Sequence, residues 1–394
     1  MGQSSGAQLV VPICQLEDGE CVAVVWNGED ANCDADCIDL FPSDVERRAL
    51  PVFVPITRRN TNGNGAAAGS RVSVVTPGLL DGDPTPVLSL IDRARADGDL
   101  IALGGVGSHP RALGFLPLIE PDVIVVGAGG LSNGADSDPI ALAQALAAVV
   151  ERSNAVVVAD GIDTDRDCER ALALGIRHGS GRKFASLHRT PHPIRSIRPR
   201  PLLAGPTWQV DPVPVGSTPF SLISRGRERI RSVKGLLVEM STQLEEQARS
   251  VGGEVVAVGT FQRLHHFPAS TERRWSDLAR AVSFTAAYGE QFSPASDLGI
   301  HRYRLRPHDP LIDEWNVIVI GARFACALSA LDLHTGGPDD KREFDYVVTY
   351  DRSTIVRAAR SVLCRPVATA ESVAAGAVRS RAALGDSRQS GSAR

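Results

Sequence analysis

The sequence predicts an α/β domain with a parallel sheet, followed by an α+β domain with an antiparallel sheet. Up to about Arg182, short β-branched runs alternate with helical or turn-rich segments, the pattern of a parallel α/β fold. Further along, three strand patterns follow one another, which is typical of an antiparallel meander. The length of 394 residues exceeds one ordinary core and suits two domains of roughly 150 to 200 residues each.

In the first domain the later strand patterns are apolar throughout, which suits strands buried on both faces. The predicted strands are residues 9–16, 21–26, 51–56, 71–76, 100–103, 123–126 and 155–159. Helices are predicted where Leu, Ile or Ala recur at three- and four-residue spacing. These helices are residues 86–97, 139–152 and 165–174.

Residues 189–216 are rich in proline, arginine and serine and lack an apolar period, which indicates a linker. In the second domain, helices are predicted at 232–250 and 272–288, on either side of the strand EVVAVGTF. The three successive strands are WNVIVIG, FACALSALDL and DYVVTYD, and a helix follows at 353–363. Residues 367–394 have no core pattern and are predicted to be disordered.

Composition and charge argue against several classes of protein. Hydrophobic residues make up 43% of the chain, charged residues 22%, and the formal net charge is -4, so the electrostatics do not favour nucleic acid. No apolar run approaches the roughly 18 to 20 residues that cross a bilayer, and no secretory signal is visible. The seven cysteines are scattered, unlike a secreted disulfide framework. We expect a cytoplasmic protein with free thiols and no membrane partner.

Four segments of the first half, taken in order, resemble one enzyme family. They are VPICQLEDGECVAVVW, LSLIDRARADGDLIALGGVGS, LPLIEPDVIVVG and VVVADGIDTDRDCERALALGIRHGSGR. They are similar to the segments that carry the Glu-Ala-Leu motif, the Asp-Asp-x-Gly motif, the sixth strand and the closing Ala-Glu-Gly motif of the EAL family of cyclic-di-GMP phosphodiesterases. The resemblance covers residues 8–188 and implies a TIM-type (β/α) barrel, shortened and irregular, with its site at the strand ends.

The resemblance also implies a reaction in which two divalent ions, held by carboxylates, activate water for attack on a phosphodiester. Most of those ligands are missing here. The family's ligand positions and their neighbours fall on or near Val25, Pro55, Val74, Gly104, Gly105, Val125 and Gly127. Two cations close together would lack the negative charge that offsets their repulsion. Catalysis by the family's mechanism is therefore not expected, nor is a bound metal.

Two carboxylates of the family pattern remain in shortened form. Asp160 and Asp163 stand where the family has Glu, and Ser180 stands where it has Gln. One interpretation makes them surviving ligands. The favoured one makes them capping or loop carboxylates, because Asp-x-x-Asp before a helix is a capping signal.

Residues 217–366 carry a second resemblance. STQLEEQA, VVAVGTFQRLHHFPASTERRWSDLARAVSFTAAYG, DEWNVIVIGARFACALSALDL and REFDYVVTYDRSTIVRAARSVL are similar to the DICT family. This family is a sensory domain named for its occurrence with diguanylate cyclases and two-component systems. The resemblance implies a sensory role and names no ligand.

Aromatic and polar residues near strand and helix ends of this second domain are candidates for a ligand site. They are Phe261, Gln262, Arg274, Trp275, Tyr288 and Trp315. The alternative, which the residue types favour, is that the large aromatics are core residues. His265 and His266, with Arg263, Arg273 and Arg274 nearby in the sequence, either hold an anion or form a solvated basic loop, and the loop is the expectation.

These features predict a bacterial signalling protein, in which a catalytically inactive EAL-like barrel is coupled to a DICT sensory domain and acts through ligand or protein binding. No cofactor is expected. One alternative is an active phosphodiesterase that uses Asp160 and Asp163. Another is a barrel that binds cyclic di-GMP without hydrolysing it. The protein partner is unknown, and one possibility is a second copy of this chain, which would form a homodimer.

Overall fold

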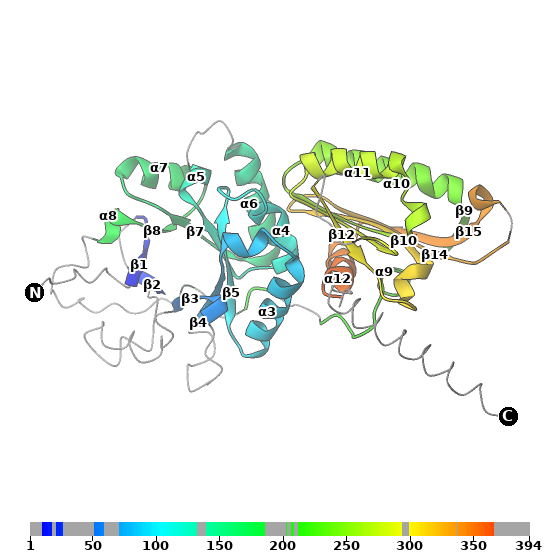
Figure 1. The fold of residues 1–394 in the computed structure, drawn as a ribbon. Helices are drawn as coiled ribbons and strands as arrows, with labels where there is room; N and C mark the ends of the chain where they lie inside the picture. The colour runs from blue at the N-terminus through cyan, green and yellow to red at the C-terminus, as the bar shows by residue number, and fades with distance from the viewer. Residues whose placement is uncertain are drawn as a thin grey trace, which may run out of the picture. The chain divides into compact units, whose positions relative to one another are not determined.

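A computed structural model describes residues 10–17, 21–26, 51–58, 71–131, 139–185, 202, 206–208, 212–293, 299–336 and 338–365. The chain forms two compact units, the first built mainly from residues up to Pro212 and the second mainly from Val213 onward (Figure 1). Among the helices within these ranges, none is both long enough and apolar enough to cross a membrane.

The first unit is a closed barrel of eight strands. The strands are β1 (Val10–Gln15), β2 (Cys21–Trp26), β3 (Val52–Pro55), β4 (Arg71–Val75), β5 (Leu100–Val106), β6 (Val123–Val126), β7 (Val156–Asp160) and β8 (His178–Ser180). Each neighbouring pair from β2 to β8 is parallel. β1 runs antiparallel to both β2 and β8. The predicted TIM-type barrel is therefore confirmed, with one strand reversed relative to the eight parallel strands of a regular one.

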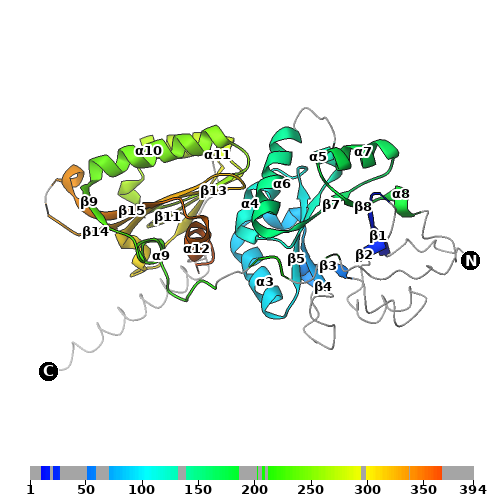
Figure 2. The same cartoon turned by 180° about the vertical axis from the view of Figure 1, so that it is seen from behind.

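The described helices lie on the outside of the barrel, mainly along β4 to β8 (Figures 1 and 2). They are α3 (Pro84–Ala96), α4 (Ala112–Ile119), α5 (Ala128–Leu131), α6 (Pro139–Ser153), α7 (Asp165–Ala173) and α8 (Arg182–Ala185), with the 3-10 turns η2 (Ile56–Arg58) and η3 (Pro77–Leu80). The sequence patterns did not predict α4. Pro117 lies inside it, and because seven of its eight residues are buried it has no polar face.

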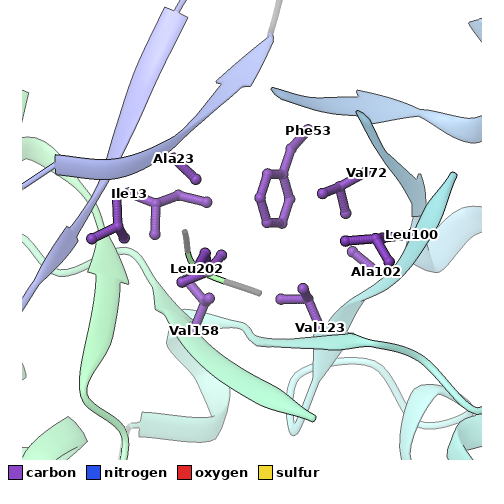
Figure 3. Close-up of a cluster of buried hydrophobic side chains, with 10 residues drawn as sticks. Ile13, Ala23, Phe53, Val72, Leu100, Ala102, Val123, Val158 and Leu202 are labelled. Carbon is purple, nitrogen blue, oxygen red and sulfur yellow. The ribbon is translucent and has the colours of Figure 1, made fainter. Parts of the chain in front are cut away.

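Apolar side chains fill the barrel (Figure 3). The buried cluster contains Ile13, Val22, Ala23, Phe53, Val72, Leu100, Ala102, Val123, Val158 and Leu202. Most come from the first residues of the parallel strands, so the core is densest at the amino-terminal ends of those strands. Leu202 comes from outside the strands, in the segment whose composition predicted a linker.

That segment contacts the barrel at two further residues. The Trp208 indole N–H donates to the carbonyl of Pro121 at 2.9 Å, and the Thr207 backbone N–H donates to Asp122 Oδ1 at 2.7 Å. The other oxygen of this buried carboxylate accepts from the backbone N–H of Ile101 at 2.9 Å. Asp122 therefore ties the segment after the barrel to the start of β5.

The second unit is built on a seven-stranded sheet in the order β12-β11-β10-β13-β14-β15-β9. The strands are β9 (Ile230–Val233), β10 (Val255–Arg263), β11 (Phe284–Glu290), β12 (Ile300–Arg304), β13 (Glu314–Gly321), β14 (Ala325–Asp332) and β15 (Glu343–Thr349). The β13-β14-β15-β9 part is antiparallel, as the meander predicted. β10, β11 and β12 are parallel neighbours. The prediction of an antiparallel sheet is therefore wrong, and the sheet is mixed.

The reason for this error lies in the stretch predicted as one helix at 272–288. The structure has α11 (Ala269–Ala281) followed by β11, with an extended Val282 between them. α11 is thus the crossover of a βαβ unit that joins β10 to β11, and such a crossover makes the strands parallel. Phe284 to Tyr288 are all buried in the sheet, and their lack of polar alternation concealed the strand.

Helices cover both faces of this sheet. α10 (Lys234–Val251) and α11 lie on one face, and α9 (Pro219–Ile223) and α12 (Arg352–Leu363) lie on the other (Figures 1 and 2). Three short 3-10 turns, η4 (Leu264–His266), η6 (Pro310–Asp313) and η7 (Asp339–Lys341), lie beside strand ends. η7 packs against α10.

Candidate functional site

The carboxyl ends of the parallel strands converge at one mouth of the barrel, the usual place for a site in such folds. Side chains two residues apart on a strand face the same side. Pro55, Val74 and Val125 therefore face the interior, two residues beyond the core residues of their strands. Val74 and Val125 pack on that core. The inner wall is apolar at three positions where the resemblance to the EAL family calls for metal ligands or their neighbours.

Two glycines at this mouth are crowded by neighbouring side chains. A Cβ built on Gly127 would collide with Ser108 Oγ, and one on Gly105, which has a φ of +72°, would collide with the Pro77 ring. Both positions fall in the segments where the EAL resemblance calls for aspartate. A carboxylate at Gly105 would strain the backbone and displace Pro77, and one at Gly127 would require the Ser108 side chain to shift.

Asp160 and Asp163 are not brought together as a ligand pair. Asp160, at the end of β7, is exposed and accepts a hydrogen bond from Ser180 Oγ at 2.8 Å. Asp163 turns toward Arg182, accepting from its backbone N–H at 2.9 Å and from its Nε at 2.8 Å. These bonds hold the pKa of Asp163 below its ordinary value. Asp163 thus links the loop before α7 to the start of α8.

Within the described part of the chain, no three His, Cys, Asp or Glu side chains gather in an arrangement that could hold a metal. Val25, on which the Glu of the Glu-Ala-Leu motif falls, lies in β2 opposite Phe53 of β3. Because Asp163 is paired with Arg182, the carboxylate that remains at this mouth among the positions assigned by the resemblance is Asp160, which is hydrogen-bonded to the Ser180 hydroxyl.

In the second unit, three of the six predicted site residues meet around a buried glutamate. Glu245 of α10 is 4% exposed. It accepts from the Trp275 indole N–H at 3.0 Å and from Arg274 Nε at 2.9 Å. The edge of the Trp275 ring contacts Phe261, with ring centroids 5.0 Å apart. This arrangement fixes α11 to α10 and to β10.

Tyr288 and Trp315 belong to other contacts. Tyr288 is completely buried and stacks on Tyr303 with centroids 4.6 Å apart. Trp315 packs edge-on to Phe344 at 6.0 Å. Its indole N–H is buried and has no hydrogen-bond partner among the described residues. The complete burial of Tyr288 and Trp275 agrees with the alternative in which these aromatics belong to the core.

Gln262, the sixth predicted residue, lies in a β-bulge at the end of β10. The pairing with β11 gains one residue between Thr260 and Arg263, and Gln262 has a φ of +58°. Such a conformation is costly outside glycine and persists where surrounding contacts hold it. Here the Gln262 amide donates to Asp332 Oδ2 at 3.2 Å and its carbonyl accepts from Arg342 Nη2 at 3.2 Å.

Arg342 is the centre of a polar cluster at this end of the sheet. Its Nη2 also donates to Asp332, which is 6% exposed at the end of β14. Its Nη1 donates to His266 Nε2 at 2.8 Å and to Asp339 Oδ1 at 3.2 Å. Arg342, Asp332 and Asp339 could not be predicted as site residues from the sequence, because they are far from Gln262 and His266 along the chain and only the sheet order brings them together.

The expectation of a solvated basic loop at His265 and His266 is wrong for His266. The His266 side chain is only 9% exposed. It contacts Arg342 rather than the arginines near it in sequence. Its pKa is lowered to about 4, first by burial and then by the neighbouring positive groups His265, Lys234 and Arg342.

The decisive comparison concerns this second unit. Residues 224–333 match the family model DICT, described as "Sensory domain in DIguanylate Cyclases and Two-component system". This segment is a DICT domain. It runs from the end of α9 through β14, so the DICT domain includes Lys234, Gln262, His266 and Asp332, while Asp339 and Arg342 follow shortly after it.

The first unit is similar in structure to EAL domains. The EAL domain of DcpA from Mycobacterium smegmatis matches with 17% identity over 46% of this chain and 91% of that one, at a TM-score of 0.36. A standalone EAL protein from Vibrio cholerae, solved with cyclic di-GMP, matches with 13% identity over 44% and 87% of the two chains, at a TM-score of 0.31. BlrP1 from Klebsiella pneumoniae, in a manganese and cyclic-di-GMP complex, matches with 14% identity over 46% and 56%, at 0.33. No curated protein matches the chain.

Proposed function

We propose that this chain is a cytoplasmic signalling protein in which a catalytically inactive EAL-like barrel is coupled to a DICT sensory domain, and that it acts through ligand or protein binding. The DICT match supports the sensory half of the proposal. The barrel architecture and the four resembling segments support the EAL-like half. The scattered cysteines are consistent with a reducing compartment.

The strand-end mouth of the barrel is the observation that carries the proposed loss of catalysis. Hydrolysis assisted by two metals needs several carboxylates to hold the ions and offset their mutual repulsion. Pro55, Val74 and Val125 offer no ligand. Gly105 and Gly127 carry no side chain, and the backbone of Gly105 does not favour one. Asp160 alone, hydrogen-bonded to Ser180, supplies too little negative charge for a pair of divalent ions.

The first prediction is that the full-length protein does not hydrolyse cyclic di-GMP with either Mg²⁺ or Mn²⁺. The assay follows product formation and the melting temperature in the same samples, beside an established phosphodiesterase as the positive control. Hydrolysis that is abolished by Asp160→Ala would overturn the proposal and make the protein an active enzyme. A rise in melting temperature without hydrolysis would instead show that the chain binds the nucleotide, by mass action on the folded state, and would favour the alternative in which the barrel is a nucleotide receptor.

For the sensory half, Trp275 and Tyr288 are fully buried in the core, and we propose that the DICT ligand site is formed from among the six predicted residues. They divide into the group around Glu245, the two separate aromatics Tyr288 and Trp315, and Gln262 in the polar cluster. The buried indole N–H of Trp315 is a donor that a ligand could satisfy. Gln262 is hydrogen-bonded to the charged side chains of Asp332 and Arg342.

A further inference from the structure

We propose that the end of the DICT sheet carries a binding site for a small oxyanion, a carboxylate or a phosphate, and that the carboxylate of Asp339 occupies this site from within the chain. The site consists of Lys234, His266 and Arg342, and is called the anion site below. If the DICT domain senses a ligand, as proposed above, this inference names the ligand's chemical class.

Two cations from different elements converge on Asp339. Lys234 is the first residue of α10, and its Nζ contacts Asp339 Oδ2. Arg342 lies directly before β15, and its Nη1 contacts Asp339 Oδ1 at 3.2 Å. The two cationic side chains are only 18% and 17% exposed. Both oxygens of one carboxylate are thus held by separate, largely buried donors, which is how proteins bind carboxylates and phosphates.

The bonds that hold Arg342 leave part of it directed at the anion. Asp332, whose side chain is 2% exposed, and Gln262 both bind Nη2. They fix the plane of the guanidinium while Nη1 points to His266 and Asp339. Because these partners are buried and themselves hydrogen-bonded, the donor is held in position before an anion arrives.

His266 borders the site and carries a buried donor of its own. A guanidinium can only donate, so Arg342 Nη1 donates to Nε2 of His266 and the imidazole proton lies on Nδ1. That N–H is buried and has no acceptor among the described residues. A buried donor without an acceptor is costly and uncommon in native proteins. The Nε2 of the same ring lies 3.9 Å from Asp339 Oδ1, so an oxyanion in place of that carboxylate would lie beside the imidazole.

Asp339 is suited to leaving. Its side chain is 62% exposed and it belongs to the three-residue turn η7. Asp332 already neutralises Arg342, so when Asp339 moves away the site keeps the uncompensated charge of Lys234. No side chain caps the start of α10 and its first turn has no acidic residue, so the positive end of the helix dipole adds to the attraction. There is open space beside Gly235, the residue next to Lys234, because a Cβ added there would meet no atom within 4 Å.

The second prediction tests this site in the full-length chain with inorganic phosphate and acetate as probes. Asp339→Asn removes the internal anion and should tighten binding of at least one probe by about tenfold, as expected for loss of one competing charge. The matched control is Asp340→Asn, the same change one residue along the same turn. It should leave the affinity unchanged. Calorimetric titrations at constant ionic strength measure both, and the tighter probe distinguishes a phosphate ligand from a carboxylate ligand.

A double variant assigns the effect to the site. Lys234→Gln added to Asp339→Asn should remove the gain, because the uncompensated cation is lost. In the unaltered chain, phosphate should shift the imidazole nitrogen resonances of His266 and leave those of exposed His265 in place. Equal gains in the two aspartate variants, or no saturable binding of either probe to Asp339→Asn, would overturn the anion site. Those results would not affect the proposed sensory role of the DICT domain. The proposal for the barrel is tested separately with cyclic di-GMP.

Discussion

Burial and the neighbouring charged side chains determine the tautomer and the pKa of His266. The guanidinium of Arg342 fixes its tautomer, while burial and the charges of His265, Lys234 and Arg342 lower its pKa to about 4, with Asp339 acting weakly in the opposite direction. In an unfolded chain the same imidazole has a pKa near 6.5. His266 is therefore neutral in the folded protein at a pH where it is charged in the unfolded one.

The third prediction follows from that difference. Because the folded pKa lies below the unfolded one, His266 contributes stability above about pH 6.5, and this contribution is lost as the pH falls through about 4. The shift corresponds to roughly 3 kcal/mol in the free energy of unfolding. Urea unfolding between pH 7 and pH 4 should therefore show a steeper loss of stability in the unaltered protein than in His266→Gln. His265→Gln, at the exposed neighbour, should keep the steep dependence, and a His266→Gln profile that matches the unaltered one would contradict this account.

At the scale of elements, Glu245 joins two helices. The carboxylate sits on α10 and accepts from two consecutive residues of α11, Arg274 and Trp275. Without it the Trp275 indole N–H would be left buried and without an acceptor. Removing one partner of a buried, charge-assisted hydrogen bond lowers the stability by more than the bond itself contributes, because the remaining group stays desolvated.

The fourth prediction is that Glu245→Ala lowers the free energy of unfolding of the DICT unit by about 2 to 3 kcal/mol. The adjacent Glu246 is the control. It pairs with Arg249 on the exposed face of the same helix, and such pairs contribute about 0.5 kcal/mol or less. Glu246→Ala should therefore have little effect. Equal losses in the two variants, measured by urea unfolding of the full chain, would show that helix propensity rather than the interhelical bond is responsible.

Strands and helices with a clear apolar pattern could be predicted from the sequence. β13 and β14 are mostly apolar, β15 has the apolar residues 346–348 between polar ends, and α10 carries one apolar stripe, so length and residue type identified them. α4 and β11 are buried on nearly all sides and carry no polar period, so the pattern that identifies a helix or strand is absent from them. With β11 concealed, the βαβ crossover and the parallel part of the sheet were also concealed.

The candidate sites could be predicted only where residues close in sequence are also close in space. Asp160 and Asp163 flank one loop, yet the structure separates them because Asp163 turns to Arg182. The anion site joins Lys234, His266 and Arg342, whose separation along the chain hides their contact. Gln262 was a candidate from its position at a strand end, and only the bulge and the sheet order show that it faces Arg342.

At the scale of the whole molecule, the barrel includes residues beyond its last strand. Leu202 fills the core between strands that lie far apart in sequence, and Thr207 and Trp208 bond to Asp122 and Pro121, directly before β6. We therefore propose that the barrel domain continues to Trp208, past the boundary at residue 188 that composition predicted. A proline-rich segment can complete a core where one leucine and two hydrogen-bonding residues meet the strands.

The last prediction tests that boundary in the full chain. Leu202→Ala leaves a cavity in the barrel core and should lower the stability of the barrel by about 2 kcal/mol. Leu172→Ala, the same substitution at a side chain of α7 that is 40% exposed, should cost much less. Because the chain forms two compact units, we expect two unfolding transitions, and Leu202→Ala should lower the one that Glu245→Ala leaves unchanged. If Leu202→Ala alters neither transition, the segment is a linker that does not contribute to the barrel. If it lowers both equally, the two units unfold as one, and the stability of the anion site is coupled to that of the barrel core.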